Sequence, residues 1–147
     1  DAKIPGNDVL DSGAGDDFLV GNAGDDVYTF ERGDGQDLTD NTGEASSNDK
    51  IQFATGIDHD QLWFREVGSD LEVTIIGTED RVYVDNWFVG TANRLDIEAG
   101  DGQSLLEANV QNLVNAMATF DPPNIGEFDL PADASQSVVD QIAASWE

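Results

Sequence analysis

Apolar and polar positions near the start of the chain recur every nine residues. Three segments share the order glycine, polar residue, aspartate, any residue, large apolar residue, and they begin at Gly6, Gly15 and Gly24. The step then lengthens, because Asp37 follows Asp26 by 11 residues and Asp49 follows Asp37 by 12. Such a unit predicts a tight glycine turn followed by a short strand with one inward apolar side chain. Stacked units of this length predict a parallel β-roll.

Beyond residue 49 the apolar positions alternate with a period of two. These runs lie at 62–64, 71–75, 82–84 and 95–97. Gly68-Ser69 separates the first two runs and is typical of a two-residue hairpin loop. The pattern predicts an antiparallel meander that caps the roll, because the last coil would otherwise present an unpaired edge.

Two helices are predicted in the last third of the sequence. Ser104 and Glu107 form a capping-box pattern before apolar residues at helical spacing up to Met117, and Pro122-Pro123 ends that segment. A second, short helix is expected from Asp133. Its apolar stripe consists of Val138, Val139, Ile142 and Trp146. The predicted fold is therefore mainly β, with a roll over residues 1–49, a capping meander over 50–100 and a helical flank over 101–147, in one folding unit.

Charge narrows the possible functions. The 147 residues include 6 Lys and Arg against 31 Asp and Glu, a net charge of −25, which argues against nucleic-acid binding and anionic membranes. The sequence has no Cys and only one His, His59, so disulfides, thiolate catalysis and most transition-metal sites are excluded. No apolar run approaches the length of a membrane span and no signal peptide opens the sequence. The first residue is not Met, so we expect a piece of a longer protein.

Two interpretations of the acidity remain, a disordered chain or a cation-binding domain. Disorder, or a plain Gly/Asp-rich linker, is the simpler alternative. However, 39% of the residues are hydrophobic, including three Trp and seven Phe, and the aspartates keep a fixed step behind the glycines. Exposed turn carbonyls, as at Gly13-Ala14-Gly15, together with an aspartate are hard oxygen donors, which is the donor set that calcium prefers.

The repeats resemble the nonapeptide G-G-x-G-x-D-x-U-x of RTX (repeats-in-toxin) proteins, where U is large and apolar. Ser12–Val20 departs from it only at the first position and Gly21–Thr29 only at the second. The resemblance implies that each of about three or more calcium ions lies between a turn and the next turn on the same side of the roll. The implied ligands comprise turn residues and aspartates: Ile4, Gly6, Asp8, Gly13, Gly15, Asp17, Gly21, Asn22, Ala23, Gly24, Asp26, Gly33, Gly35, Asp37, Asp40 and Asp49. Their implied pairings join the turn of Asp8 to that of Asp26, Asp17 to Asp37, and Asp26 to Asp49, with Asp40 a further candidate where the roll ends.

The rest of the chain resembles the segment that follows the last RTX repeats in many exported proteins, including the family of adenylate cyclase–haemolysin toxins. The resemblance rests on Asp60–Phe64, Gly68–Val73, Ile76–Asp80, Asn86–Phe88, Val110–Pro123 and Ala143–Trp146. It implies a secreted, extracellular bacterial protein and the type I secretion machinery as a partner, with the export signal within about residues 129–147. It further implies that the chain is disordered in calcium-poor cytosol and folds as a monomer on calcium outside the cell.

Two other functions stay open at this stage. Catalysis is not expected, because some pair among 31 acidic residues always falls at a convenient spacing and no Gly-x-Ser-x-Gly elbow occurs. His59, between two aspartates, is expected to be a solvated loop residue. The stronger alternative is a calcium-dependent adhesin that recognises a glycan or peptide through Trp63, Trp87 and Tyr83, although these aromatic side chains also suit a core.

Overall fold

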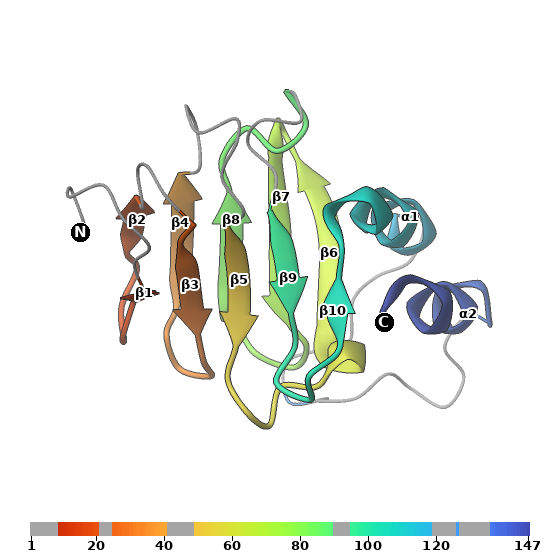
Figure 1. Cartoon of the computed structure of the whole chain (residues 1–147), viewed down its shortest axis with the longest axis horizontal. Helices are drawn as coiled ribbons and strands as arrows, with labels where there is room; N and C mark the ends of the chain where they lie inside the picture. The colour runs from red at the N-terminus through yellow and green to blue at the C-terminus, as the bar shows by residue number, and fades with distance from the viewer. Residues whose placement is uncertain (1–8, 21–24, 41–48, 90–94, 119–125, 127–135) are drawn as a thin grey trace.

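Two five-stranded β-sheets face each other in the structure, a computed structural model that describes residues 9–20, 25–40, 49–89, 95–118, 126 and 136–147 (Figure 1). The first sheet has the order β1 (Val9–Asp11), β3 (Val27–Phe30), β5 (Lys50–Phe53), β9 (Asp96–Glu98) and β10 (Ser104–Leu105). The second has the order β2 (Phe18–Val20), β4 (Gln36–Asp40), β8 (Arg81–Val84), β7 (Asp70–Ile75) and β6 (Leu62–Val67). Two short helices follow near the C-terminal end, so the fold is mainly β, as predicted.

Successive strands of the repeat region alternate between the two sheets. Strands β1, β3, β5 and β9 pair in parallel, and so do β2, β4 and β8. In the first sheet the register aligns Leu10, Tyr28, Ile51 and Ile97 in one column, and all four side chains are buried. The inward position predicted two residues after each aspartate is therefore confirmed for Leu10 and Tyr28. Both sheets become mixed at their other end and do not close.

The predicted meander is present in β6, β7 and β8, which pair antiparallel. Gly68-Ser69 forms the tight hairpin between Val67 and Asp70, as its sequence indicates. Strand β8 also pairs in parallel with β4, so the meander continues the second sheet. Residues 95–97 do not belong to the meander, because β9 pairs in parallel with β5 and places Ile97 in the core column of the other sheet.

Helix α1 (Glu107–Met117) buries Val110, Leu113, Val114 and Met117 and packs against β6. Its predicted cap is wrong. Ser104 lies in β10, Leu106 occupies the N-cap position, and the Oδ1 atom of Asp96 accepts the Glu107 N–H at 2.9 Å. The extended pairing of Ser104 with β9 therefore replaces the capping box, and a carboxylate from the neighbouring strand takes over its role.

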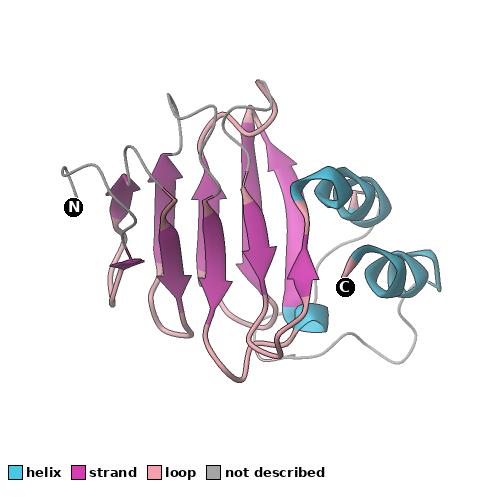
Figure 2. Cartoon of the chain, viewed as in Figure 1, coloured by secondary structure: helices cyan, strands magenta, loops and turns pink. Residues whose placement is uncertain are grey.

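Helix α2 (Gln136–Ser145) packs beside α1 at the end of the two sheets nearest β6 and β10 (Figure 2). Val138, Ile142 and Trp146 are buried, whereas Val139 is exposed, so three of the four predicted stripe residues reach the core. Asp133 and Pro122-Pro123 lie outside the described residues. Trp146 packs against Phe64, and the backbones of Glu147 and Ser104 exchange two hydrogen bonds of 2.9 Å. The end of the described chain is thereby attached to β10.

Candidate calcium sites

The turns that precede the parallel strands lie in two rows, one on each edge of the sheets. The turns 13–17, 33–37 and 77–80 come before β2, β4 and β8, whose arrows all point to the same edge in Figure 1, opposite to β3 and β5. Gly13, Gly15, Gly33 and Gly35 have φ values of 67°, 112°, 95° and 98°. Only glycine adopts these conformations without strain, which explains the alternating glycines in the repeat.

Asp17 and Asp37 occupy equivalent positions in two neighbouring turns. The Asp17 N–H donates to the Oδ1 atom of Asp37 at 2.9 Å, and the Leu38 N–H donates to the Asp17 carbonyl at 2.9 Å. A Cβ built on Gly35 would lie 2.9 Å from the Gly15 carbonyl oxygen, so the two turns are in close contact. This is one of the three pairings that the resemblance implies.

One carboxylate oxygen of each residue in this pair is buried. Asp37 is 1% exposed, and the Oδ2 atoms of Asp17 and Asp37 are buried with no hydrogen-bond partner among the described residues. Burial raises the pKa of Asp37, and the charges of Asp17 and Asp34 add to this, although hydrogen bonds from the Asp17 N–H and from Ser12 oppose it. Adjacent anions and free carboxylate oxygens indicate a position for a positive charge.

Asp26 and Asp49 form a second pair with the same geometry on the opposite edge. The Asp26 N–H donates to Oδ1 of Asp49 at 2.7 Å, and the Lys50 N–H donates to the Asp26 carbonyl at 3.0 Å. Both aspartates are buried, at 0% and 3% exposed. The longer sequence intervals before Asp37 and Asp49 therefore do not disturb the stacking.

Three further carboxylates belong to these turns and were not predicted as site residues. Asp34, 4% exposed, accepts hydrogen bonds from the Glu31 N–H and the Ser12 hydroxyl. The Oδ1 atom of Asp16 accepts the Gln36 N–H at 2.9 Å. Asp80 binds the N–H groups of Gly33 and Gly35 at 2.9 and 3.0 Å. The doubled aspartate at Asp16-Asp17 was the only sequence signal for any of them.

Asp40 lies apart from these pairs, at the opposite end of β4. There it influences Asp85, whose pKa is raised by burial, by the charges of Asp70 and Asp40 and by a side-chain hydrogen bond with Asp70. Asp70 also accepts the Asn86 N–H at 2.8 Å. These carboxylates come from three strand ends, and the sequence pattern gave no sign that Asp70 and Asp85 approach Asp40.

Several predicted ligands lie outside the described residues: Ile4, Gly6, Asp8, Gly21, Asn22, Ala23 and Gly24. Among the described ones, Gly13 and Gly15 precede Asp17, while Gly33 and Gly35 precede Asp37. The carbonyl of Gly35 accepts the Arg81 N–H at 2.9 Å and so faces the turn 77–80 rather than the turn 13–17. The roles of all these residues as ligands stay predictions.

The donor set is one of oxygen atoms. In the described part of the chain, no three side chains of His, Cys, Asp or Glu converge in a way that would hold a metal by themselves. A cation at these turns would need backbone carbonyls beside the aspartates. Carboxylate and carbonyl oxygens together suit calcium, which takes six to eight oxygen ligands in flexible geometry.

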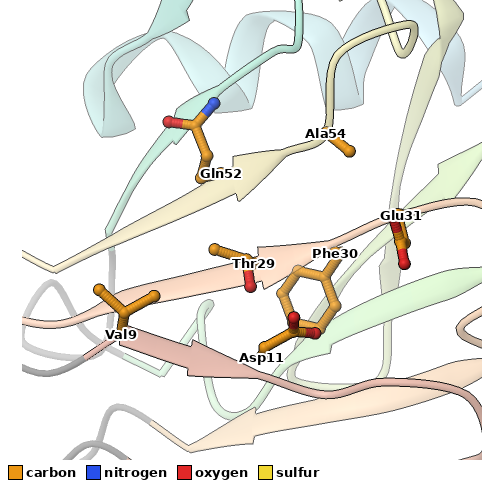
Figure 3. Close-up of a pocket in the computed structure, with 7 residues that line it drawn as sticks. All are labelled: Val9, Asp11, Thr29, Phe30, Glu31, Gln52 and Ala54. Atoms are coloured by element: carbon orange, nitrogen blue, oxygen red, sulfur yellow. The ribbon is translucent and has the colours of Figure 1, made fainter.

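The aromatic platform expected for an adhesin is not formed by the tryptophans. Trp63 and Trp87 are 4% and 1% exposed and fill the core. A groove of ≈ 360 Å³ lies on the outer face of the first sheet at its β1 edge, lined by Val9, Asp11, Thr29 and Gln52 among others (Figure 3). Phe30 also borders it but is 3% exposed, so no open aromatic face is available there.

His59 is not a solvated loop residue. It begins the 3₁₀-helix η1 (His59–Gln61), its Nδ1 atom lies 2.6 Å from Oδ2 of Asp101, and its ring packs against Trp146. Although burial alone raises the pKa of Asp101, the hydrogen bonds from the His59 ring, Gln103 N–H and His59 N–H lower it overall. His59 therefore has a structural contact and no place at the aspartate turns.

Stacked glycine turns, paired buried aspartates and parallel strands define a calcium-binding repeat protein. Two comparisons with protein families agree. Residues 5–37 match the family model of the RTX calcium-binding nonapeptide repeat (4 copies), and residues 70–105 match that of the haemolysin-type calcium binding protein related domain. These two matches support an RTX calcium-binding protein. Neither description names an enzymatic activity. No helix among the described residues is long and apolar enough to span a membrane.

Proposed function

We propose that this chain is a calcium-dependent folding and type I secretion module of a larger, secreted RTX protein. In this proposal the repeat region is a parallel β-roll, residues 50–100 form its cap and residues 101–147 form a flank that contains the export signal. The observation that carries the proposal is the stacked pair of aspartates on each edge, Asp17 with Asp37 and Asp26 with Asp49, in which Asp37, Asp26 and Asp49 are buried and Asp17 is partly buried.

Without calcium these turns oppose folding. Bringing Asp17 within hydrogen-bond distance of Asp37 places two carboxylates together in a site from which water is largely excluded. The cost of burying unpaired charge is several kcal/mol per ion. Calcium held by these carboxylates and the neighbouring turn carbonyls would offset that cost. Because the unfolded chain lacks the site, binding free energy then becomes folding free energy.

The requirement for calcium suits export. A chain that stays unfolded where calcium is scarce can pass through a narrow channel. Sites with dissociation constants of about 10⁻⁴ to 10⁻³ M then become occupied at the calcium concentration outside the cell. Most side chains of the single apolar core come from the cap and helices, which supports a role for them as the surface on which the roll is built. Folding would then proceed from β8 and β9 toward β1 and β2.

A calcium titration of the whole chain tests the proposal. Far-ultraviolet circular dichroism should show lower β content in EGTA than in calcium, with a cooperative gain at millimolar calcium, and magnesium at the same concentration should not replace calcium. Equal β content in EGTA and in calcium would contradict it.

A matched pair of variants ties the transition to the site. Asp37→Asn should raise the calcium concentration at half-folding, because it removes one ligand charge from a buried position. Glu66→Gln removes the same charge from an exposed position on β6 and should leave the midpoint unchanged. Equal shifts in the two variants would mean that net charge, and not the aspartate pair, controls folding.

A further inference from the structure

The column of aspartates that contains Asp17 and Asp37 does not continue into the meander. The register pairs Asp37 of β4 with Val82 of β8, and Val82 is 2% exposed. The third turn of this row, 77–80, therefore lacks an aspartate at the repeat position. A carboxylate is nevertheless present, because Asp80 comes two residues earlier.

Asp80 holds the turn above it with both oxygen atoms. Its Oδ2 atom accepts the Gly33 N–H at 2.9 Å and its Oδ1 atom accepts the Gly35 N–H at 3.0 Å. The Arg81 N–H in turn donates to the Gly35 carbonyl at 2.9 Å. Hydrogen bonds to a charged acceptor are about twice as strong as neutral ones, so this is a firm attachment of the turn 33–37 to β8.

Asp80 is itself fixed in place. The Thr78 hydroxyl accepts the Asp80 N–H at 3.0 Å and donates to the Ile75 carbonyl at 2.8 Å. The Asp80 carbonyl accepts the Ile75 N–H at 3.1 Å. The turn from Ile75 to Asp80 is thus closed by its own hydrogen bonds, and it belongs to the meander because it joins β7 to β8.

The contacts of Asp80 set the direction of two carbonyl groups. The described chain has no cis peptide, and in a trans peptide the N–H and C=O groups point in opposite directions. Since the Gly33 and Gly35 N–H groups point to Asp80, the carbonyls of Arg32 and Asp34 point away from it. Strand order β2-β4-β8 puts the turn 13–17, with Asp17, on that side.

We propose that Asp80 is a positioning residue for the calcium site between the turns 13–17 and 33–37. It touches no ion itself. By binding Gly33 and Gly35 from the meander side, it orients the Arg32 and Asp34 carbonyls toward the Asp17–Asp37 pair as the turn folds with calcium. This inference rests on the proposed function and adds to it the contact through which the cap prepares the first site.

Charge alone predicts the opposite effect, which makes the inference testable. If Asp80 were only one more anion beside an acidic turn, removing its charge would relieve repulsion and lower the calcium requirement. If Asp80 positions the turn, removal should raise that requirement. Glu79→Gln is the matched control, because Glu79 is an exposed carboxylate on the same turn.

The experiment is calorimetric titration of the full chain with calcium chloride. Loss of charge-assisted hydrogen bonds should weaken the affected site by about tenfold in Asp80→Ala. Asp80→Asn keeps one acceptor oxygen and should lie between Asp80→Ala and wild type, whereas Glu79→Gln should match wild type or bind slightly better. A shift of Asp80→Ala toward tighter binding, or no shift, overturns the proposal.

Urea unfolding in EGTA separates positioning from a general structural role. Tryptophan fluorescence reports on the meander through Trp63 and Trp87, and its midpoint in EGTA should be the same in Asp80→Ala and wild type. An equal loss of stability in EGTA and in calcium would overturn the proposal. Absence of calcium binding by the wild-type chain would overturn the proposed function as well, whereas normal wild-type binding with an unaffected Asp80→Ala variant overturns this inference alone.

Discussion

The molecule has two halves, the repeat region with β1 to β5 and the C-terminal half with the meander and the helices. Buried carboxylates occur in both halves, but their surroundings differ. In the meander, Glu72 is 4% exposed and lies 3.3 Å from an Arg65 nitrogen and 3.7 Å from an Arg81 nitrogen. In the repeat region, Asp37 is 1% exposed and its nearest charged neighbours are Asp17 and Asp34. The meander neutralises its buried charge with its own side chains. In the repeat region we propose that calcium takes this role.

The two halves also differ in how many large apolar side chains they bury. The repeat strands β1 and β2 have three residues each and bury one large side chain apiece, Leu10 and Leu19. Strands β6 and β7 have six residues each and enclose side chains such as Phe64 that are fully buried beneath α1 and α2. Most of the buried apolar surface therefore lies in the meander and helices, and the proposed dependence on calcium concerns the repeat region.

Removal of calcium should have the largest effect, and it should be confined to one half. In EGTA the amides of Leu38 and Lys50, which bond to the aspartate turns, should lose protection from hydrogen exchange, while amides within β6 and β7 keep it. An ion at about 100 times its dissociation constant contributes about 2.7 kcal/mol, so protection should fall about 100-fold per ion lost. Exchange mass spectrometry measures this. An equal loss of exchange protection in both halves would mean that the two halves depend on calcium to the same extent.

Phe64→Ala should affect both halves even in saturating calcium. Phe64 is fully buried, packs against Trp146 and donates its N–H to the Met117 sulfur at 3.2 Å. The truncation should cost about 3–5 kcal/mol. Thermal unfolding followed by circular dichroism gives the loss, and Val67→Ala, at an exposed position on β6, serves as the control. If the repeat region still responded to calcium while the meander was unfolded, folding of the repeat region would not depend on the cap.

Gly35→Ala should act on the repeat half through the contact between turns. Both Gly35 and Gly56 have a positive φ, 98° and 99°, so alanine is strained at either position by about 1–3 kcal/mol. Only at Gly35 would the new Cβ meet Gly15 O at 2.9 Å and Asp16 Oδ1 at 2.8 Å, whereas nothing lies within 4 Å at Gly56. Calcium titration should therefore show a higher midpoint for Gly35→Ala than for Gly56→Ala. Identical midpoints would mean that the turns do not need this close approach.

Asp101→Asn should have the smallest effect, in the C-terminal half and with a defined pH dependence. Because the folded-state pKa of Asp101 is lowered, its contribution to stability is present above the unfolded pKa near 3.8 and is lost as pH falls through the folded value. At pH 5–6 the variant should lose up to about 1 kcal/mol, typical of a surface pair. Urea unfolding of both proteins at pH 6 and pH 2 checks this, and a difference that persists at pH 2 would assign the loss to something other than the carboxylate charge.

Much of the repeat half follows from local sequence. A nine-residue unit predicts its own turn and strand, and the resemblance to RTX repeats implied the pairing of Asp17 with Asp37. It implied the pairing of Asp26 with Asp49 as well, and the longer intervals between these aspartates did not prevent it. Asp80 was not predictable in this way. It reaches Gly33 from 47 residues further along the chain, and only the parallel pairing of β8 with β4 brings them together.

Two of the errors outside the site have a common cause. Alternating apolar residues at 95–97 are equally consistent with parallel and antiparallel pairing, and the choice of β5 as partner is a tertiary effect. Likewise, Ser104 with Glu107 satisfies the capping-box pattern, but β9 and Glu147 provide backbone partners that hold Ser104 extended. In both cases long-range hydrogen bonds outweigh a local preference.

The attachment of Glu147 to Ser104 also has a mechanical consequence. A pulling force applied at Glu147 passes through two backbone hydrogen bonds directly into β10 and from there into the first sheet. Helix α2 is bypassed until that pair breaks, so the load reaches the sheet before it reaches the helices. In a stretching experiment, the loss of the Glu147–Ser104 pair is expected as the first event, followed by the extension of α2.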